Sequence, residues 1–551
     1  MSTQDLKPFA SAREVSAAAA VFGGFAILYA ALRSHDIFGT DGAHRCLEVF
    51  RRQAIFFHEN NHMLYPVNVL AWSRLAGLFG VRPESPFAFY GLTELMNCFA
   101  AAASLALVFL LIQRTIRSWR IALGATVFLG LSRAFFAQAT NANEAVMGLF
   151  WSLLAIFVLA LGMRARSLIL TFVSGLLFAL SMATYESMVF LAPAGLVLIW
   201  LSGAEETRKS RGLRPLLVTE GIFLLGCLIA WLGIHGWADA RTGNTRPGEM
   251  VRQLFRMQDA RSYLGVGPGK LLNLPAGLIR NLFPVLTQFD GLRHVWAGPR
   301  SSLAVFLLIS AVVFGFLFLC GARLWKRQGE LPGPMRQGVW TAIVGLLFTL
   351  VPLVIWDPQY EKLWLQPLVL LAVLAAIALK TSAKQGWKSN LAFRILPALL
   401  LAGGFFNFPS IASNHRADVS AYFQDAQEVS RMVDGQDLVV GDWDKVATLY
   451  GEAWAPEDRI MDFVTQGVYY GRGATGRLRQ SVAETERRGG RVYFLGLLDQ
   501  SETEWNSFLG PRCGVPRSDL DLYRNHSHIV ASYRNGSDTI FLRRLDSSPG
   551  N

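Results

Sequence analysis

Charged residues are scarce in this chain, at 17% of 551 residues, and there are only 5 cysteines. Cys98, Cys227 and Cys320 lie in apolar runs and no CxxC pair occurs, so neither a disulfide framework nor a cysteine metal site is indicated. An internal repeat and a low-complexity tract are also lacking. Hydrophobic residues make up 52% of the chain, more than a soluble core needs, and we therefore interpret it as a polytopic membrane protein.

Long apolar runs define the predicted membrane spans. A transmembrane helix needs about 20 mostly apolar residues. Such runs occur near residues 15–32, 86–112, 119–139, 145–162, 168–184, 187–202, 216–237, 302–322, 337–356, 363–379 and 391–409. We therefore expect a polytopic α-helical membrane protein with about 11 transmembrane helices.

The distribution of Lys and Arg predicts how these helices are oriented, because cytoplasmic loops carry an excess of both residues. Basic residues gather in every second loop, at 7–13, 114–120, 164–166, 208–214, 323–336 and 380–394. This alternation predicts a cytoplasmic N-terminus and an extracytoplasmic C-terminal region.

The net charge of +12 belongs to the membrane part of the chain. Residues 413–551 hold 16 Lys and Arg against 20 Asp and Glu, so the positive excess reflects topology and not nucleic-acid binding. We predict a transmembrane domain at 1–410 and a small extracytoplasmic α/β domain at 411–551. In the second, "DLVVGDW" and "RVYFLGLL" are typical of buried strands, and "HIVASYR" with "DTIFLRRL" is typical of a hairpin.

Polar chemistry concentrates in the predicted outer loops. Residues 35–66 hold Asp36, Asp41 and four of the nine histidines, and a long basic loop follows at 239–301. Carboxylates near membrane depth are costly and usually face a cavity or a partner. Glu144 or Glu186 alone could cap a helix or pair with an arginine, but their shared face favours a site for an anionic lipid head group and a polar partner.

Three short segments carry a resemblance to a known family. They are "TDGAH" after the first apolar run, "NHMLYPVNVLAWSRL" (Asn61 to Leu75) and "QYEKLWLQPL" in the last outer loop. Together with the polar second outer loop, they resemble the membrane glycosyltransferases of the GT-C fold, in particular the protein mannosyltransferase and aminoarabinose transferase-like group. The resemblance spans roughly residues 15–410 and implies that 61–75 runs along the membrane before the second span.

The resemblance implies transfer of a sugar from a polyprenyl-phosphate donor to a glycan, lipid or protein acceptor at the extracytoplasmic face. Asp41 matches the family's first-loop catalytic acid, with Asp36 as the alternative; either could instead hold a turn beside a glycine. A carboxylate there can accept the acceptor's proton and stabilise an oxocarbenium-like centre. Lys362 matches a late basic residue that contacts the donor phosphate. The predicted substrate-binding residues are His62, Tyr65, Asn143, Glu144, Tyr185, Glu186, Tyr360 and Lys362.

"HENNH" (His58 to His62) offers a different hypothesis, because it fits the HExxH pattern of zinc proteases, in which two histidines on one helix bind zinc. A downstream segment, "NLFPVLTQFDG", would supply Asp290 as a third ligand. Against this, Asn60 and Asn61 are weak helix formers, and the motif lies in a polar loop instead of an apolar helix. The downstream segment is also longer than the intramembrane protease pattern.

Two further alternatives concern metal and transport. His44, His58 and His62 could bind a divalent metal within a transferase; no other cofactor is implied. A lipid-linked sugar transporter or flippase would place polar residues on both faces or near mid-membrane, often with repeat symmetry, and neither is evident. We expect an integral protein of the bacterial inner membrane, given its Arg- and Ala-rich usage, with membrane lipids and no nucleic acid as partners.

Overall fold

The structure is a computed structural model, and it describes most of the helical part of the chain and the strands near its end. The described residues are 11–33, 45–46, 49–50, 62–210, 214–242, 268–283, 300–355, 357–358, 360–383, 403, 407, 429, 431–441, 460–463, 473–506, 514–535 and 538–546.

Helices dominate residues 12–383. They are α1 (Ala12–Ala31), α3 (Tyr65–Leu78), α4 (Pro86–Ile116), α5 (Trp119–Gly130), α6 (Arg133–Ala139), α7 (Glu144–Ala165), α8 (Leu168–Thr184), η2 (Glu186–Leu191), α9 (Ala192–Ser210), α10 (Arg214–Thr242), α13 (Pro268–Leu282), α15 (Arg300–Arg327), η4 (Gln328–Glu330), α16 (Gly333–Ile355) and α17 (Glu361–Ala383). Each apolar run predicted between residues 15 and 379 is helical. The run at 391–409 lies outside the described residues apart from Gly403 and Asn407.

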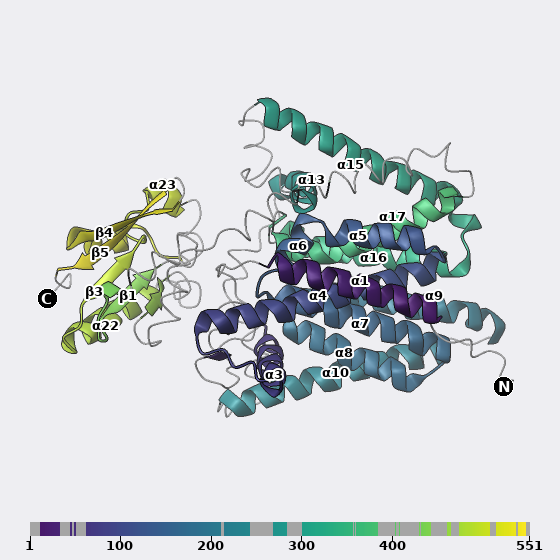
Figure 1. Cartoon of the computed structure of the whole chain (residues 1–551), viewed down its shortest axis with the longest axis horizontal. Coiled ribbons are helices and arrows are strands. Elements are labelled where there is room, and N and C mark those ends of the chain that lie inside the picture. Colours follow the sequence, from purple (N-terminus) through teal and green to yellow (C-terminus); the bar gives the residue numbers. More distant parts are fainter. Residues whose placement is uncertain are drawn as a thin grey trace.

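Seven helices of the described residues are long and apolar enough to cross a membrane, and the bent pair α5–α6 makes an eighth. The predicted spans at 168–184 and 187–202 correspond to shorter apolar helices. The helices α1, α4, α5, α7, α8, α10, α16 and α17 run roughly parallel in Figure 1, whereas α3 crosses their ends. The prediction of a polytopic helical membrane protein is confirmed: this is an integral membrane protein.

Local sequence explains where several of these helices begin. Ser11 and Glu14 form a capping box at the start of α1, in which each side chain accepts a hydrogen bond from the other residue's backbone N–H. The Ser85 side chain caps α4, and Pro86 follows at a first-turn position that needs no backbone N–H. The break between α5 and α6 bends the chain by 68°, so that α6 starts a new direction at Arg133.

Two glycines allow α8 and α10 to pack with their backbones in contact. A Cβ atom on Gly175 would lie 2.2 Å from the carbonyl oxygen of Phe223, and one on Gly226 would lie 2.4 Å from that of Phe172. Small residues at such crossings are common in membrane helices, because packing is then the main source of association energy. The contact continues to the end of α8, where Ala183 belongs to the same buried cluster as Ile234 and Ala238 of α10.

A five-stranded sheet forms from the C-terminal part of the chain. Its strands are β1 (Leu438–Gly441), β2 (Ile460–Asp462), β3 (Val492–Leu495), β4 (Ser527–Asn535) and β5 (Asp538–Leu545), in the order β2-β1-β3-β5-β4. The strands β2, β1 and β3 are parallel, and β5 joins β3 and β4 in antiparallel pairs. Helices α22 (Gly473–Arg487), α23 (Glu502–Glu504) and α25 (Ser518–Asn525) accompany the sheet. The predicted small α/β region is confirmed.

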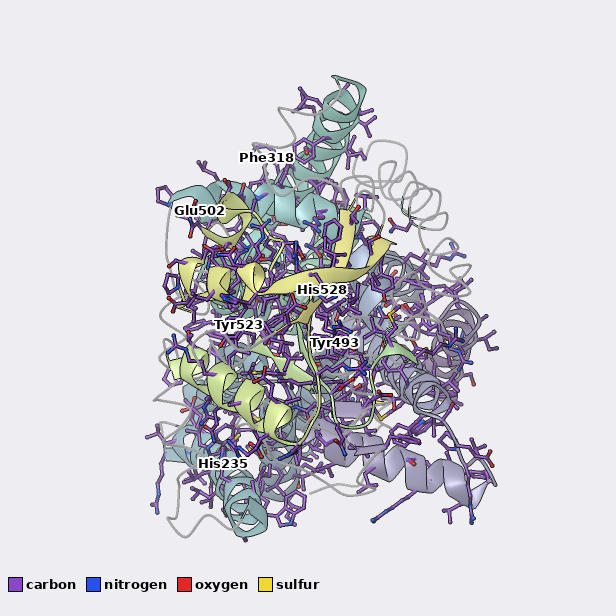
Figure 2. All side chains as sticks on the ribbon, turned by 90° about the vertical axis from the view of Figure 1, so that its left-hand side faces the viewer. His235, Phe318, Tyr493, Glu502, Tyr523 and His528 are labelled. Atoms are coloured by element: carbon purple, nitrogen blue, oxygen red, sulfur yellow. The ribbon has the colours of Figure 1, made fainter. Side chains whose placement is uncertain are left out.

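The predicted strands and hairpin are found in this sheet. All four residues of β1 and of β3 are buried, as the apolar runs predicted. Asn535 of β4 pairs with Asp538 of β5, which is the expected hairpin. In Figure 2 the sheet lies in front of the helices, with Tyr493 of β3, Tyr523 of α25 and His528 of β4 labelled. The rings of Phe494 and Tyr523 lie 5.4 Å apart and pack α25 onto the sheet.

The contact between α8 and α10 yields a prediction. Gly226→Ala should lower the free energy of unfolding by about 1–3 kcal/mol, because the added methyl group has no space against Phe172. Gly221→Ala in the same helix is the control: a Cβ there meets nothing within 4 Å. Thermal denaturation in detergent would measure both, and equal stabilities of the two variants would contradict the close contact.

Candidate functional site

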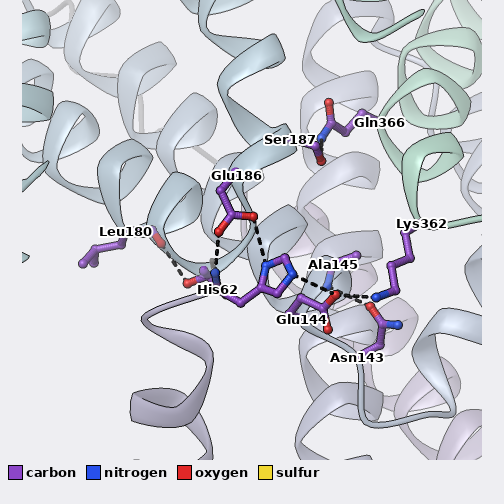
Figure 3. Close-up of polar contacts among 10 residues, drawn as sticks. His62, Asn143, Glu144, Ala145, Leu180, Glu186, Ser187, Lys362 and Gln366 are labelled. Carbon is purple, nitrogen blue, oxygen red and sulfur yellow. Dashed lines mark hydrogen bonds and ion pairs between the residues drawn. The ribbon is translucent and has the colours of Figure 1, made fainter. Parts of the chain in front are cut away.

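Four ionisable side chains meet at one end of the helical region (Figure 3). Glu144 is the first residue of α7, Glu186 the first of η2 and Lys362 the second of α17. His62 lies shortly before α3. All four belong to the predicted substrate-binding set, and the structure brings them into contact although they are far apart in the sequence.

Lys362 and Glu144 form a buried ion pair. The Lys362 Nζ atom lies 2.5 Å from Oε1 of Glu144, and the two side chains are 4% and 0% exposed. A charge taken out of water requires a partner. The positive end of the α7 dipole favours Glu144, whereas the corresponding end of α17 disfavours Lys362. Glu144 is therefore the group that stabilises the lysine charge.

The second carboxylate oxygen of Glu144 has a different environment. Oε2 is buried, and it accepts no hydrogen bond from the part of the chain that the structure describes. Buried acceptors are nearly always satisfied, so an open one calls for an explanation. This oxygen can accept a hydrogen bond from a hydroxyl group of a bound molecule.

His62 lies between the two glutamates. Its Nδ1 atom is 3.0 Å from Oε2 of Glu186, and its Nε2 atom is 3.7 Å from Oε1 of Glu144. The backbone N–H of His62 also donates to Oε1 of Glu186. The residue has a φ of 57°, a left-handed conformation that is uncommon outside glycine. Glu186 thus contacts both the backbone and the ring of His62. The row of contacts from Glu186 through His62 and Glu144 to Lys362 alternates acidic and basic groups.

Two asparagines fix the backbone that carries Glu144. Asn143 is the N-cap of α7, and its Oδ1 accepts a 2.9 Å hydrogen bond from the N–H of Ala145. Asn97 of α4 donates from Nδ2 to the carbonyl oxygens of Asn141 and Asn143, each at 2.7 Å. The sequence had indicated Asn143 but not Asn97, which lies inside an apolar run with no local sign of its role.

Aromatic side chains surround the ionisable groups. The rings of Tyr185 and His62 lie 5.5 Å apart, and the Lys362 Nζ atom lies 5.7 Å from the centre of the Tyr360 ring. A cation near an aromatic face gains additional electrostatic stabilisation. Tyr65 is fully buried at the start of α3, whereas Tyr360 is 37% exposed. Of these rings, Tyr360 is therefore the one accessible from solvent.

A second ion pair lies beside the first. Arg133 of α6 places one guanidinium nitrogen 2.5 Å from Oε1 of Glu361, the residue before Lys362. Successive residues on an α-helix point about 100° apart, so Glu361 reaches α6 while Lys362 reaches α7. Arg133 lies within the predicted span at 119–139 and Glu361 within "QYEKLWLQPL", but nothing in the sequence pairs them.

The structure does not describe most of the first-loop residues predicted to act in catalysis or metal binding. Asp36, Asp41, His44 and His58 are outside the described residues. Within the described ranges, no group of three or more His, Cys, Asp or Glu side chains could hold a metal ion.

The conformation of His62 bears on the HExxH hypothesis. That motif requires both histidines on one helix. His62 has a left-handed backbone and precedes α3, so it does not continue a helix. Its Nδ1 atom already contacts Glu186. The geometry at this residue disfavours a zinc-protease motif.

Comparison with known proteins identifies the fold. No protein-family model and no curated protein sequence matches the chain. Among solved structures, it is similar to ArnT from Cupriavidus metallidurans in the apo state, with a TM-score of 0.60 and 12% identity over 97% of this chain and 99% of that one. The structure of the same protein bound to undecaprenyl phosphate gives a TM-score of 0.55 and 11% identity, over 97% and 98% of the two chains.

A weaker likeness is to the oligosaccharyltransferase of Archaeoglobus fulgidus in its apo form, with a TM-score of 0.47 and 12% identity over 96% of this chain and 76% of that one. The similarity to ArnT extends over nearly the whole length of both chains. The GT-C fold predicted from the short sequence segments is thereby confirmed.

The buried ion pair yields a prediction about stability. Glu144→Gln and Lys362→Met should each lower the free energy of unfolding by about 3–5 kcal/mol, because each leaves a buried charge without its partner. The double variant should lose less than the sum of the two. Unfolding in mixed detergent and SDS micelles would measure this.

The control is Glu484→Gln, which breaks an exposed pair with Arg488 on α22. That change should cost less than about 1 kcal/mol. Strictly additive losses at Glu144 and Lys362 would show that the two side chains do not form a pair.

Proposed function

We propose that the protein is a membrane glycosyltransferase that moves one sugar from a polyprenyl-phosphate donor to a glycan, lipid or protein acceptor. The observation that supports this most is the buried Lys362–Glu144 pair, with its open carboxylate oxygen, at the helix ends of a GT-C fold. It combines a cation for a phosphate with an acceptor for a sugar hydroxyl.

Lys362 would contact the donor phosphate. Phosphate groups form strong charge-assisted hydrogen bonds with lysine and arginine, and Arg280 of the basic outer loop would add a second cation. The similar ArnT structure contains undecaprenyl phosphate. A polyprenyl phosphate is accordingly the donor class that we propose for this chain.

An apolar cavity supports a lipid-linked donor. It lies between α17 and the helices α5, α13 and α15, and its α17 wall consists of Leu368, Leu371, Ala372, Ala375 and Leu379. Leu368 follows Lys362 by six residues, or about 9 Å along a helix axis. A molecule with an anionic head and an isoprenoid tail could therefore bind its head at Lys362 and its tail along the cavity wall of α17.

In the proposed reaction, the acceptor hydroxyl attacks the anomeric carbon of the donor sugar, and the bond from that carbon to the phosphate oxygen breaks. Asp41 would take the hydroxyl proton, with Asp36 as its nearby alternative. Lys362 would stabilise the negative charge of the departing polyprenyl phosphate. Asn143, Glu144, Tyr185 and Glu186 would line the sugar cavity together with the buried His62 and Tyr65, and the more exposed Tyr360 would lie at its entrance.

The site would face the extracytoplasmic side. The alternation of basic loops puts the N-terminus in the cytoplasm, and the ends of α7 and α17 that carry Glu144 and Lys362 then lie outside. We propose a bacterial inner membrane, a transmembrane domain at 1–410 and an extracytoplasmic domain at 411–551. Figure 1 shows the sheet on the same side of the helices as α3, α6 and α13, where it could meet an acceptor.

Transfer of labelled sugar from polyprenyl-phosphate donors by the purified protein tests this function. Lys362→Gln should lower kcat/KM at least about 100-fold, since it removes a cation from the developing phosphate charge. Asp41→Asn should abolish transfer. Chelator should leave transfer intact, and loss of transfer would show that a divalent metal takes part.

Lys326→Gln is the matched control, because Lys326 is exposed in the last turn of α15, on the opposite side of the membrane in the predicted topology. This variant should transfer sugar at the wild-type rate. If the wild-type protein consumes no polyprenyl-phosphate sugar, or if Lys362→Gln is fully active, the proposed function is wrong.

A further inference from the structure

Helix α13 contacts the segment that leads into α17 at several points. This segment runs from Ile355, the last residue of α16, to Trp364 in the first turn of α17, and it includes Lys362. At the start of α13, the Lys270 Nζ atom donates a 2.6 Å hydrogen bond to the carbonyl oxygen of Ile355. Partial burial lowers the pKa of Lys270, while nearby Asp357 acts in the opposite direction by favouring the charged form. Both interactions attach the first turn of α13 to the beginning of this segment.

The middle of α13 approaches the same segment through a glycine. A Cβ atom on Gly277 would lie only 1.9 Å from the carbonyl oxygen of Pro358 and 3.3 Å from the ring of Trp364. That carbonyl is held in place, because Trp364 Nε1 donates a 2.7 Å hydrogen bond to it. Glycine is the residue that permits such a close backbone approach.

The last turn of α13 connects to α17 through Arg133. One guanidinium nitrogen of Arg133 lies 2.5 Å from Glu361, and the other donates a 3.4 Å hydrogen bond to the carbonyl oxygen of Arg280. Glu361 directly precedes Lys362. Contacts at the start, middle and end of α13 therefore converge on the few residues that carry the lysine.

We infer that Gly277 and Arg133 are positioning residues for sugar transfer: together they make α13 a clamp that holds Lys362 where it can reach both Glu144 and the donor phosphate. This inference rests on the proposed function, since it presumes that Lys362 binds that phosphate. An alanine at 277 must push α13 or the Pro358 carbonyl away. A displacement of about 1 Å near a reacting group can cost about 100-fold in rate.

The chain offers a matched pair of variants in the same helix. Gly277→Ala adds a methyl group against Pro358, whereas Gly269→Ala adds one where nothing lies within 4 Å. With the full chain in nanodiscs and undecaprenyl phosphate as the probe, Gly277→Ala should weaken binding about 10-fold or more. Gly269→Ala should bind as the wild type does.

A second comparison separates positioning from general damage. In a Lys362→Gln background, Gly277→Ala should cause no further loss of binding, because the group through which it acts is already gone. If the losses of binding caused by Gly277→Ala and Lys362→Gln add in full, the inference is wrong. It is also wrong if Gly277→Ala alone binds the probe as tightly as the wild type. Failure of the wild-type protein to bind the probe would instead refute the proposed function.

Arg133→Gln tests the same clamp if Gly277→Ala does not fold. It removes the contact with Glu361 and should raise the donor KM more than it lowers kcat. Glu361→Gln should produce the same change, and the double variant should be no worse than either single one. An unchanged donor KM in both single variants would overturn the role assigned to Arg133.

Discussion

The buried ion pair between Lys362 and Glu144 is the constraint on which the arrangement of the site depends. With exposures of 4% and 0% for the two side chains, each charge is stable only while the other is in place. The first turns of α7 and α17 must therefore stay aligned. Asn97 and Asn143 fix the α7 side, and α13 with Arg133 fixes the α17 side. These hydrogen bonds and the Arg133–Glu361 ion pair all help to hold Glu144 and Lys362 in contact.

The same pair limits how an anionic ligand can bind. The four groups of the cluster comprise two carboxylates, one lysine and one histidine, so they offer no surplus of positive charge. A phosphate that approaches Lys362 also meets the field of Glu144. In the proposed function, further cations would be needed to balance it, and the basic residues of the predicted outer loop at 239–301, with Arg280 of α13 among them, would supply these.

Hydrophobicity was sufficient to locate the long apolar helices, because an apolar run of span length has few alternatives in a membrane, but it did not reveal α13, which lies within the predicted loop at 239–301. The cost of burying carboxylates identified Glu144 and Glu186 as candidates, whereas Lys362 was identified by the family resemblance and His62 by its place in the polar stretch at 35–66. Their pairing was not predictable, since Glu144 and Lys362 are 218 positions apart and only packing brings them together. Gly277 gave no sequence signal at all, because its importance comes from a backbone approach by Pro358.

The separation of those partners also matters for biogenesis. Because 218 positions separate the two residues, a ribosome that adds 5–20 residues per second makes Lys362 about 10–40 s after Glu144. During that interval α7 is already present, but Lys362, the cation that neutralises Glu144 at its start, has not yet been synthesised. The nascent chain must therefore keep Glu144 in water, protonated, or shielded by the insertion machinery until α17 arrives. Closure of the site is thus a late event in the assembly of this protein in the membrane.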